Sequence, residues 1–198
     1  MATDDLFLFL NTLFPISPSL DLAIRERLIL TNFQKGDIIA SPGRRADEIW
    51  FIASGLAKEY HFEASGNKVI TTFWKENEMM VIADSFFQKQ PSDRYIRLIE
   101  DSTLFNLESK TAHELLHLYP EIRPIEHKIH SLSKKKMEDR VSLMTMNGSA
   151  RYRHFCKNFP YSRISITDTA SYLGLTRVGL SQIRAKNNDF PGGGAAQH

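Results

Sequence analysis

The sequence is poor in cysteine and has no long apolar run. Cys156 is the only cysteine among 198 residues, which excludes an intramolecular disulfide and any site held by several thiolates of one chain. No apolar run approaches the roughly 18 residues of a membrane-spanning helix. The segment LFLFL follows Asp4 and Asp5, without the basic residues or the cleavage site of a signal peptide. We therefore expect a cytoplasmic protein with an amphipathic first helix and no membrane partner.

The sequence also lacks the motifs of common enzymes. It contains no GxSxG, no Walker-type loop and no dinucleotide fingerprint. One enzyme motif is present. Residues 113–117, HELLH, match the HExxH motif of zinc proteases. A catalytic zinc needs a third protein ligand, and Pro120 stops this segment at once. The candidates for that ligand are Glu121, Glu126, His127 and His130. A zinc hydrolase is thus a minor alternative to a short surface helix, and we expect no enzyme, no metal and no cofactor.

The charge of the chain is small in total but uneven in distribution. The formal net charge is +2 at pH 7. Residues 148–187 contain seven basic residues and one acidic residue, Asp168, which gives +6, and the remainder carries −4. Basic charge gathered on a small terminal segment is typical of phosphate binding. A merely solvated basic face would have the same composition.

Residues 165–186 have the spacing of two short helices joined by a tight turn. Gly174 accepts the positive φ that such a turn needs, and Thr176 is suited to cap the second helix. The pattern is a small residue, a turn glycine and two apolar residues, at Ala170, Gly174, Leu180 and Ile183. This spacing predicts a DNA-reading helix-turn-helix. An ordinary helical hairpin is the alternative.

The rest of the chain changes twice in periodicity. Helical spacing predicts helices over residues 4–13 and 20–30, the second capped by Ser17 or Ser19. From Phe33 to about Leu107, short β-rich runs alternate with glycine turns, which predicts an antiparallel roll or barrel. Further expected elements are a short helix over 79–87, helices over 111–120, 122–146 and 150–159, and a strand over 163–166.

The long helix expected over residues 122–146 has an apolar seam on an otherwise polar surface. The seam consists of Ile122, Ile125, Ile129, Leu132 and Met137. Such a seam needs a partner, which is either the chain's own roll or the same helix of a second subunit. We favour the second subunit, because DNA readers with two-fold symmetry need two recognition helices.

These residues resemble the Crp/Fnr family of transcription regulators over nearly the whole chain. KGDIIASPG, DEIWFIASGLAKEY and IEDSTLFNL resemble the family's cyclic-nucleotide-binding-like β-roll, and RYRHFCKNFP and TASYLGLTRVGLSQIR resemble its DNA-binding domain. The resemblance implies an α+β fold with an N-terminal antiparallel β-roll, a long dimerisation helix and a C-terminal all-α, winged-helix-like domain. The expected domains are residues 1–118, 119–147 and 148–198. The tail from Asn187 has no core-forming pattern, and we expect it to be mobile.

The resemblance implies a homodimer on a palindromic operator in double-stranded DNA, acting on RNA polymerase. The seam residues Ile122, Ile125, Ile129 and Leu132 would form the dimer interface, and the recognition helices would enter major grooves about 34 Å apart. Positions 177, 178, 181 and 182 would face bases, and basic residues beside them would contact phosphates. The DNA-binding residues implied are Thr176, Arg177, Val178, Ser181, Gln182, Arg184, Lys186 and Arg163. Val178, Gly179 and Gln182 depart from the residues usual in the family, so no operator sequence carries over.

The effector pocket departs furthest from the family. Val81 and Ile82 stand where nucleotide-binding members have a Gly-Glu pair, and Ser92 and Asp93 stand where they have an Arg pair. Arg94 and Arg97 lie close in sequence. Because an aspartate repels a phosphate, we expect that cyclic AMP does not bind in the family's manner. The alternative to a regulator is a ligand-binding or protein-interaction module whose DNA-binding half has degenerated.

Overall fold

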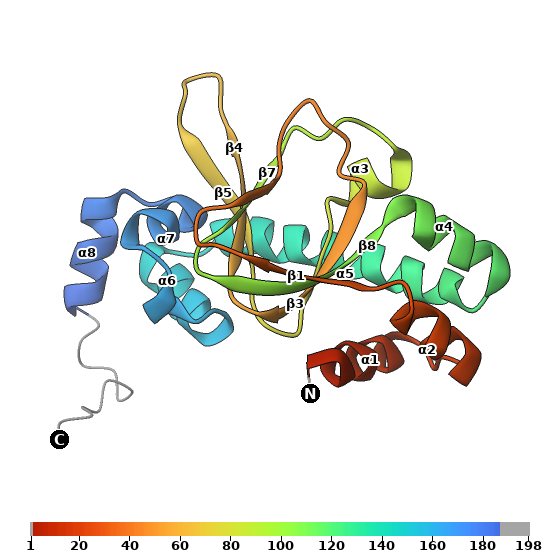
Figure 1. Cartoon of the computed structure of the whole chain (residues 1–198). Coiled ribbons are helices and arrows are strands. Elements are labelled where there is room, and N and C mark those ends of the chain that lie inside the picture. The colour runs from red at the N-terminus through yellow and green to blue at the C-terminus, as the bar shows by residue number, and fades with distance from the viewer. Residues whose placement is uncertain (1, 187–198) are drawn as a thin grey trace.

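The computed structural model describes residues 2–186, and the tail expected to be mobile lies outside them. A β-roll occupies the centre, two N-terminal helices cover one side of it, a long helix crosses behind it, and the last helices gather at one end (Figure 1). The strands are β1 Ile29–Phe33, β2 Ile38–Ala40, β3 Glu48–Ser54, β4 Ala57–Phe62, β5 Lys68–Trp74, β6 Met79–Met80, β7 Tyr95–Leu98 and β8 Ser102–Glu108. The helices are α1 Ala2–Leu13, α2 Pro18–Arg25, α3 Ala83–Gln88, α4 Ser109–Leu118, α5 Ile122–Met144, α6 Gly148–Asn158, α7 Ile166–Leu173 and α8 Arg177–Lys186, with a 3₁₀ turn at Tyr161–Arg163.

The roll consists of two four-stranded antiparallel sheets, as the sequence predicted. The strand orders are β1-β8-β3-β6 and β2-β7-β4-β5. The chain passes from β3 in the first sheet to β4 in the second through Gly55, which has a φ of +112°. A Cβ at this position would collide with the Ser102 side chain. Only glycine fits this corner, because it alone combines the positive φ with the close approach.

Three hydrophobic cores hold the molecule together. One fills the roll around Ile52 and Leu104, and a second joins the first sheet to α1, α2, α4 and α5. The third lies between the second sheet and the C-terminal helices. At its centre the ring of Phe73 in β5 lies 5.3 Å from that of Tyr172 in α7, centroid to centroid. The helix-turn-helix unit is therefore packed directly onto the roll.

Two predicted helices end or begin differently from the sequence prediction. The helix expected over residues 20–30 ends at Arg25, and Ile29 and Leu30 belong to β1, which pairs with β8. The helix expected over residues 79–87 begins only at Ala83, because Met79 and Met80 pair with β3. In both places the apolar spacing suits a helix, but a neighbouring strand supplies the hydrogen bonds. Ser17 is the cap of α2 and accepts from the Leu20 amide at 3.2 Å.

The strand expected over residues 163–166 is wrong. Residues Tyr161–Arg163 form the 3₁₀ turn, and Ile164 is buried among the C-terminal helices. Ser165 then caps α7, and its hydroxyl accepts from the Asp168 amide at 3.1 Å. No strand pairs with this segment among residues 2–186, and Ile164 and Ile166 pack in the core between the second sheet and the C-terminal helices.

Candidate functional site

The helix-turn-helix has the local geometry that its spacing predicted. Gly174 ends α7 with a φ of +61°, and the next amide, that of Leu175, donates to the Ala170 carbonyl at 2.9 Å. The Thr176 hydroxyl accepts from the Gly179 amide at 3.0 Å and so caps α8. Both ends of the turn thus have satisfied backbone groups.

The helix α8 buries one face and exposes the other. Leu180 is fully buried and Ile183 packs against the start of α6, so closely that a Cβ on Gly148 would lie 2.9 Å from its Cδ1. The exposed residues of α8 and its cap include seven of the predicted DNA-binding residues, namely Thr176, Arg177, Val178, Ser181, Gln182, Arg184 and Lys186. Val178 is 68% exposed, the largest value among the exposed large hydrophobic residues.

The Arg163 side chain contacts the roll, whereas the resemblance implied that it contacts DNA. Its guanidinium forms ion pairs with Glu76 and Glu100 of the roll. Hydrogen bonds from these two carboxylates raise the pKa of Arg163. The predicted phosphate contact at Arg163 is therefore corrected, because this side chain already joins the 3₁₀ turn to the roll.

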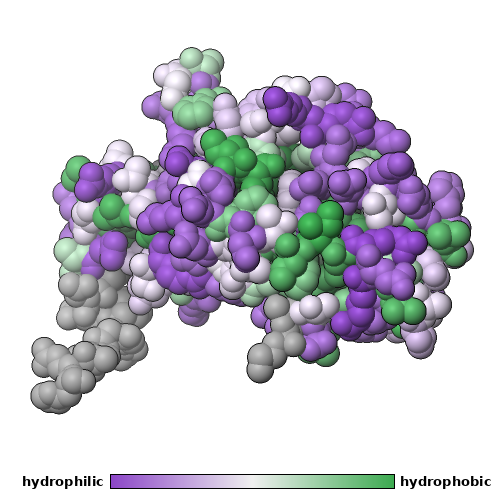
Figure 2. Space-filling model, viewed as in Figure 1, coloured by the Kyte–Doolittle hydropathy of each residue, from purple (hydrophilic) through white to green (hydrophobic). Residues whose placement is uncertain are grey.

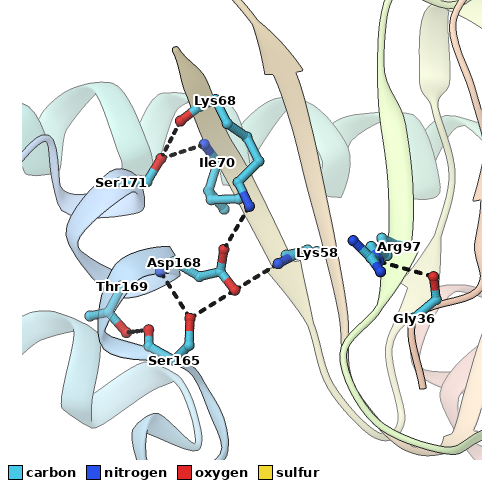
Figure 3. Close-up of polar contacts among 9 residues, drawn as sticks. All are labelled: Gly36, Lys58, Lys68, Ile70, Arg97, Ser165, Asp168, Thr169 and Ser171. Carbon is cyan, nitrogen blue, oxygen red and sulfur yellow. Dashed lines mark hydrogen bonds and ion pairs between the residues drawn. The ribbon is translucent and has the colours of Figure 1, made fainter.

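A buried ion pair fixes α7 on the roll (Figure 3). Lys58 Nζ of β4 lies 2.6 Å from Asp168 Oδ2, and Lys68 Nζ of β5 lies 3.3 Å from Asp168 Oδ1. Lys58 and Asp168 are each 7% exposed. Burial acts to raise the pKa of Asp168, but the hydrogen bond from Lys58 and the charges of both lysines keep it below its ordinary value. No local pattern predicts this contact, because more than 100 residues separate Lys58 from Asp168.

Ser171 completes the attachment of α7. Its hydroxyl donates to the Lys68 carbonyl at 2.8 Å and accepts from the Ile70 amide at 3.0 Å (Figure 3). The strand β5 lies at the edge of its sheet, so these backbone groups have no strand partner on that side. A helix side chain therefore covers the open sheet edge.

The predicted effector residues lie around a cavity of about 300 Å³ between the roll and α5. Five of the six line it, namely Val81, Ile82, Ser92, Asp93 and Arg94. Arg97 does not, since it is exposed and its Nε donates to the Gly36 carbonyl at 2.9 Å (Figure 3). This corrects the prediction for Arg97.

The cations around this cavity already have carboxylate partners. Arg94 Nε donates to Asp93 at 2.9 Å, and Arg94 Nη1 lies 3.8 Å from Glu59 Oε1. Burial raises the pKa of Glu59, although Thr71 donates a hydrogen bond to its carboxylate. Lys136 Nζ contacts Glu78 at 2.7 Å. Sequence reasoning missed Glu59, Thr71 and the residues of α5 that line this cavity, because their approach depends on how α5 crosses the roll.

The seam predicted on α5 divides into two parts. Ile125 and Ile129 are buried in the core that α5 shares with α1, α2 and the first sheet, and Ile122 packs against that core. These three residues are therefore not available to a second subunit, which corrects the prediction. Leu132, Met137 and Val141 are the exposed hydrophobic residues of α5, at 41%, 55% and 67%.

The HExxH histidines do not face one site. His117 is exposed, whereas His113 is half-buried and lines an apolar cavity. No group of three His, Cys, Asp or Glu side chains suited to a metal occurs within residues 2–186. In the same part of the chain, no helix is both long enough and apolar enough to cross a membrane.

The fold and the site together define a class: a cyclic-nucleotide-binding-type β-roll joined by one long helix to a helix-turn-helix unit. The family model for the cyclic nucleotide-binding domain matches residues 30–119. The transcriptional activator protein Anr of Pseudomonas protegens is 24% identical over 164 residues, which span 76% of this chain and 66% of Anr, just under two thirds of its length.

Solved structures share this fold. FixK2 from Bradyrhizobium japonicum matches with a TM-score of 0.72 and 15% identity, over 81% of this chain and 84% of its own. The c-di-GMP-responsive global regulator CLP from Xanthomonas campestris matches with a TM-score of 0.68 and 14% identity, over 86% and 91%. Residues 30–119 thus match the cyclic nucleotide-binding domain, and the chain shares its fold with regulators of the Crp/Fnr type.

Proposed function

We propose that the protein is a homodimeric, sequence-specific DNA-binding transcription regulator that acts in the cytoplasm, in contact with RNA polymerase. The exposed face of α8 carries this proposal. Arg177, Ser181 and Gln182 are exposed on a helix whose opposite face is buried at Leu180 and packs on the start of α6 through Ile183. A rigid helix that presents polar side chains from its first turns suits the major groove.

Five exposed side chains of α8 have assigned roles in this proposal. Arg177 would read guanine through two hydrogen bonds, and Gln182 would pair with adenine. Val178 would contact a thymine methyl group. Arg184 and Lys186, nearer the end of the helix, would bind phosphates and set the register without reading sequence.

Selection of bound sites from random DNA, followed by fluorescence-anisotropy titration, tests the proposal. We expect a palindrome, and affinity that falls steeply with salt. Arg177→Ala is expected to reduce discrimination at one base pair of each half-site by about 5- to 150-fold, the equivalent of about 1–3 kcal/mol. Lys110→Ala removes the same charge from an exposed position on α4 and should leave that discrimination unchanged. Absence of a selected site together with a flat salt response would contradict the proposal and favour the ligand-binding module.

The dimer in this proposal uses the exposed half of α5. Met137 and Val141 are four residues apart, and Lys134 continues the same line three residues before Met137. This alternation is the spacing of a two-helix seam. Pairing along it would place two copies of α8 for successive grooves on one side of the duplex.

We further propose that cyclic AMP is not the effector. Arg94 is already engaged by Asp93 and Glu59, so a cyclic phosphate would compete with two carboxylates for one guanidinium. Titration calorimetry with cyclic AMP is expected to show no saturable heat at micromolar concentrations. A micromolar affinity that Arg94→Ala abolishes would overturn this.

A further inference from the structure

A second cavity, of about 120 Å³, is lined by an earlier part of α5, residues 122–129, than the Glu59 and Arg94 cavity, which residues 130–137 line. It opens partly to the surface, it is lined mainly by α1, α2, α3, α4, the N-terminal half of α5 and the first sheet, and it shares no lining residue with the polar cavity. Of its 19 lining residues, 17 are apolar. Four of these are phenylalanines, at positions 51, 86, 87 and 105.

This cavity is an apolar hollow that opens partly to the surface and adjoins fully packed residues such as Leu115, which is 1% exposed. Contiguous apolar surface left uncovered in this way marks a ligand or partner site. An apolar cavity of about 150 Å³ lined by Leu, Ile and Phe stays dry and binds benzene. Ala112 of α4 is the smallest residue of the lining, so a larger side chain at this position would fill part of the space.

The two polar lining residues determine what kind of head group fits. His113 Nδ1 lies 2.6 Å from the Ser109 carbonyl oxygen, and a carbonyl only accepts, so Nδ1 carries the proton. In the neutral ring Nε2 is then an acceptor, and it makes no hydrogen bond within the described part of the chain. Glu126, the other polar residue, also offers acceptor oxygens. The cavity thus has a mostly apolar, partly aromatic lining and two hydrogen-bond acceptors, His113 Nε2 and the Glu126 carboxylate.

We propose that this cavity is a binding site for a small neutral aromatic molecule with one hydroxyl group, of the phenol class. The ring occupies the space among the phenylalanines, and the hydroxyl donates to His113 Nε2 or to Glu126. The site assigns a role to His113, the first of the two histidines in the HExxH pattern. Ile122, Ile125 and Ile129 of α5 line the site, so a ligand there contacts the helix that leads to the helix-turn-helix. A regulatory effect of binding rests on the proposed function, whereas binding itself does not.

Calorimetry on the full chain tests the site with two probes, phenol and toluene, which differ by the hydroxyl. We expect saturable binding of both at micromolar to millimolar concentrations. His113→Leu is expected to weaken phenol by about three- to tenfold, the range for one lost hydrogen bond, and to leave toluene unchanged. Ala112→Phe is expected to abolish both. Lys110→Phe, which adds the same ring on the exposed side of α4, should change neither.

Absence of saturable heat for both probes would overturn the proposal, and so would unchanged affinity in Ala112→Phe. If circular dichroism shows that Ala112→Phe does not fold, Leu116→Trp fills the same cavity and takes its place. Anisotropy with the selected DNA, measured on the same samples, separates the two proposals, because loss of phenol binding with intact DNA binding rejects only the cavity site.

Discussion

Arginines of one basic segment have different tasks in the folded chain. Arg151 donates to the carbonyls of Met144, Met146 and Leu173, and so joins the ends of α5 and α7. Arg163 is paired with the roll. Arg177, in contrast, is exposed on α8. The charge count of the sequence therefore overstates the charge that is available to phosphates, since two of its seven cations stabilise the fold.

Asp168 carries the first residue-scale prediction. Asp168→Asn is expected to lower the free energy of unfolding at pH 7 by about 3–5 kcal/mol, because Lys58 stays buried without its counter-charge. The pKa of Asp168 is lowered in the folded state, so its stabilising contribution is present above the unfolded pKa of about 3.9. It is lost as the pH falls through the folded pKa. Urea unfolding between pH 7 and pH 2 measures both effects.

Two variants control this experiment. Glu114→Gln neutralises an exposed carboxylate on α4 and should stay close to the wild type. Lys58→Met combined with Asp168→Leu removes both buried charges and should recover much of the stability, because the remaining partner, Lys68, is partly exposed to solvent. If Asp168→Asn keeps the wild-type dependence on pH, the ion pair does not contribute as described.

At the scale of elements, α5 has two halves with different surroundings. The N-terminal half buries Ile125 and Ile129 against the N-terminal helices, and the C-terminal half exposes Met137 and Val141. A seam that looked continuous in sequence therefore serves two purposes. The first half closes the protomer, and the second half offers the dimer surface of our proposal.

Val141→Glu tests that second half. A charge in the centre of an apolar seam is expected to raise the dimer dissociation constant at least about tenfold, since one tenfold step is about 1.4 kcal/mol. Sedimentation equilibrium over a range of concentrations measures it. Ser142→Glu places the same charge about 100° around the helix and should leave the dimer intact. Equal behaviour of the two variants, or a monomeric wild type, would contradict a dimer along this face.

The whole molecule joins the β-roll and the helix-turn-helix unit through a continuous core. Phe73 of the roll contacts Phe155 and Tyr172 of the C-terminal helices, and the ion pair of Asp168 lies beside them. Most of the visible surface is hydrophilic, with hydrophobic residues in separate groups over the roll and beside the N-terminal helices (Figure 2). The helix-turn-helix of this structure is thus fixed to the roll by apolar packing and by ion pairs.

The sequence by itself determined the features that depend on neighbours a few residues apart. The turn at Gly174, the caps at Ser17 and Thr176 and the strand-rich roll all follow from local spacing and backbone preference. The tertiary structure alone decided which face of α5 is buried, which arginines are engaged and where Arg97 points. These outcomes depend on contacts between residues far apart in the chain, such as Lys58 with Asp168, and periodicity contains no information about the partner that covers an apolar or charged face.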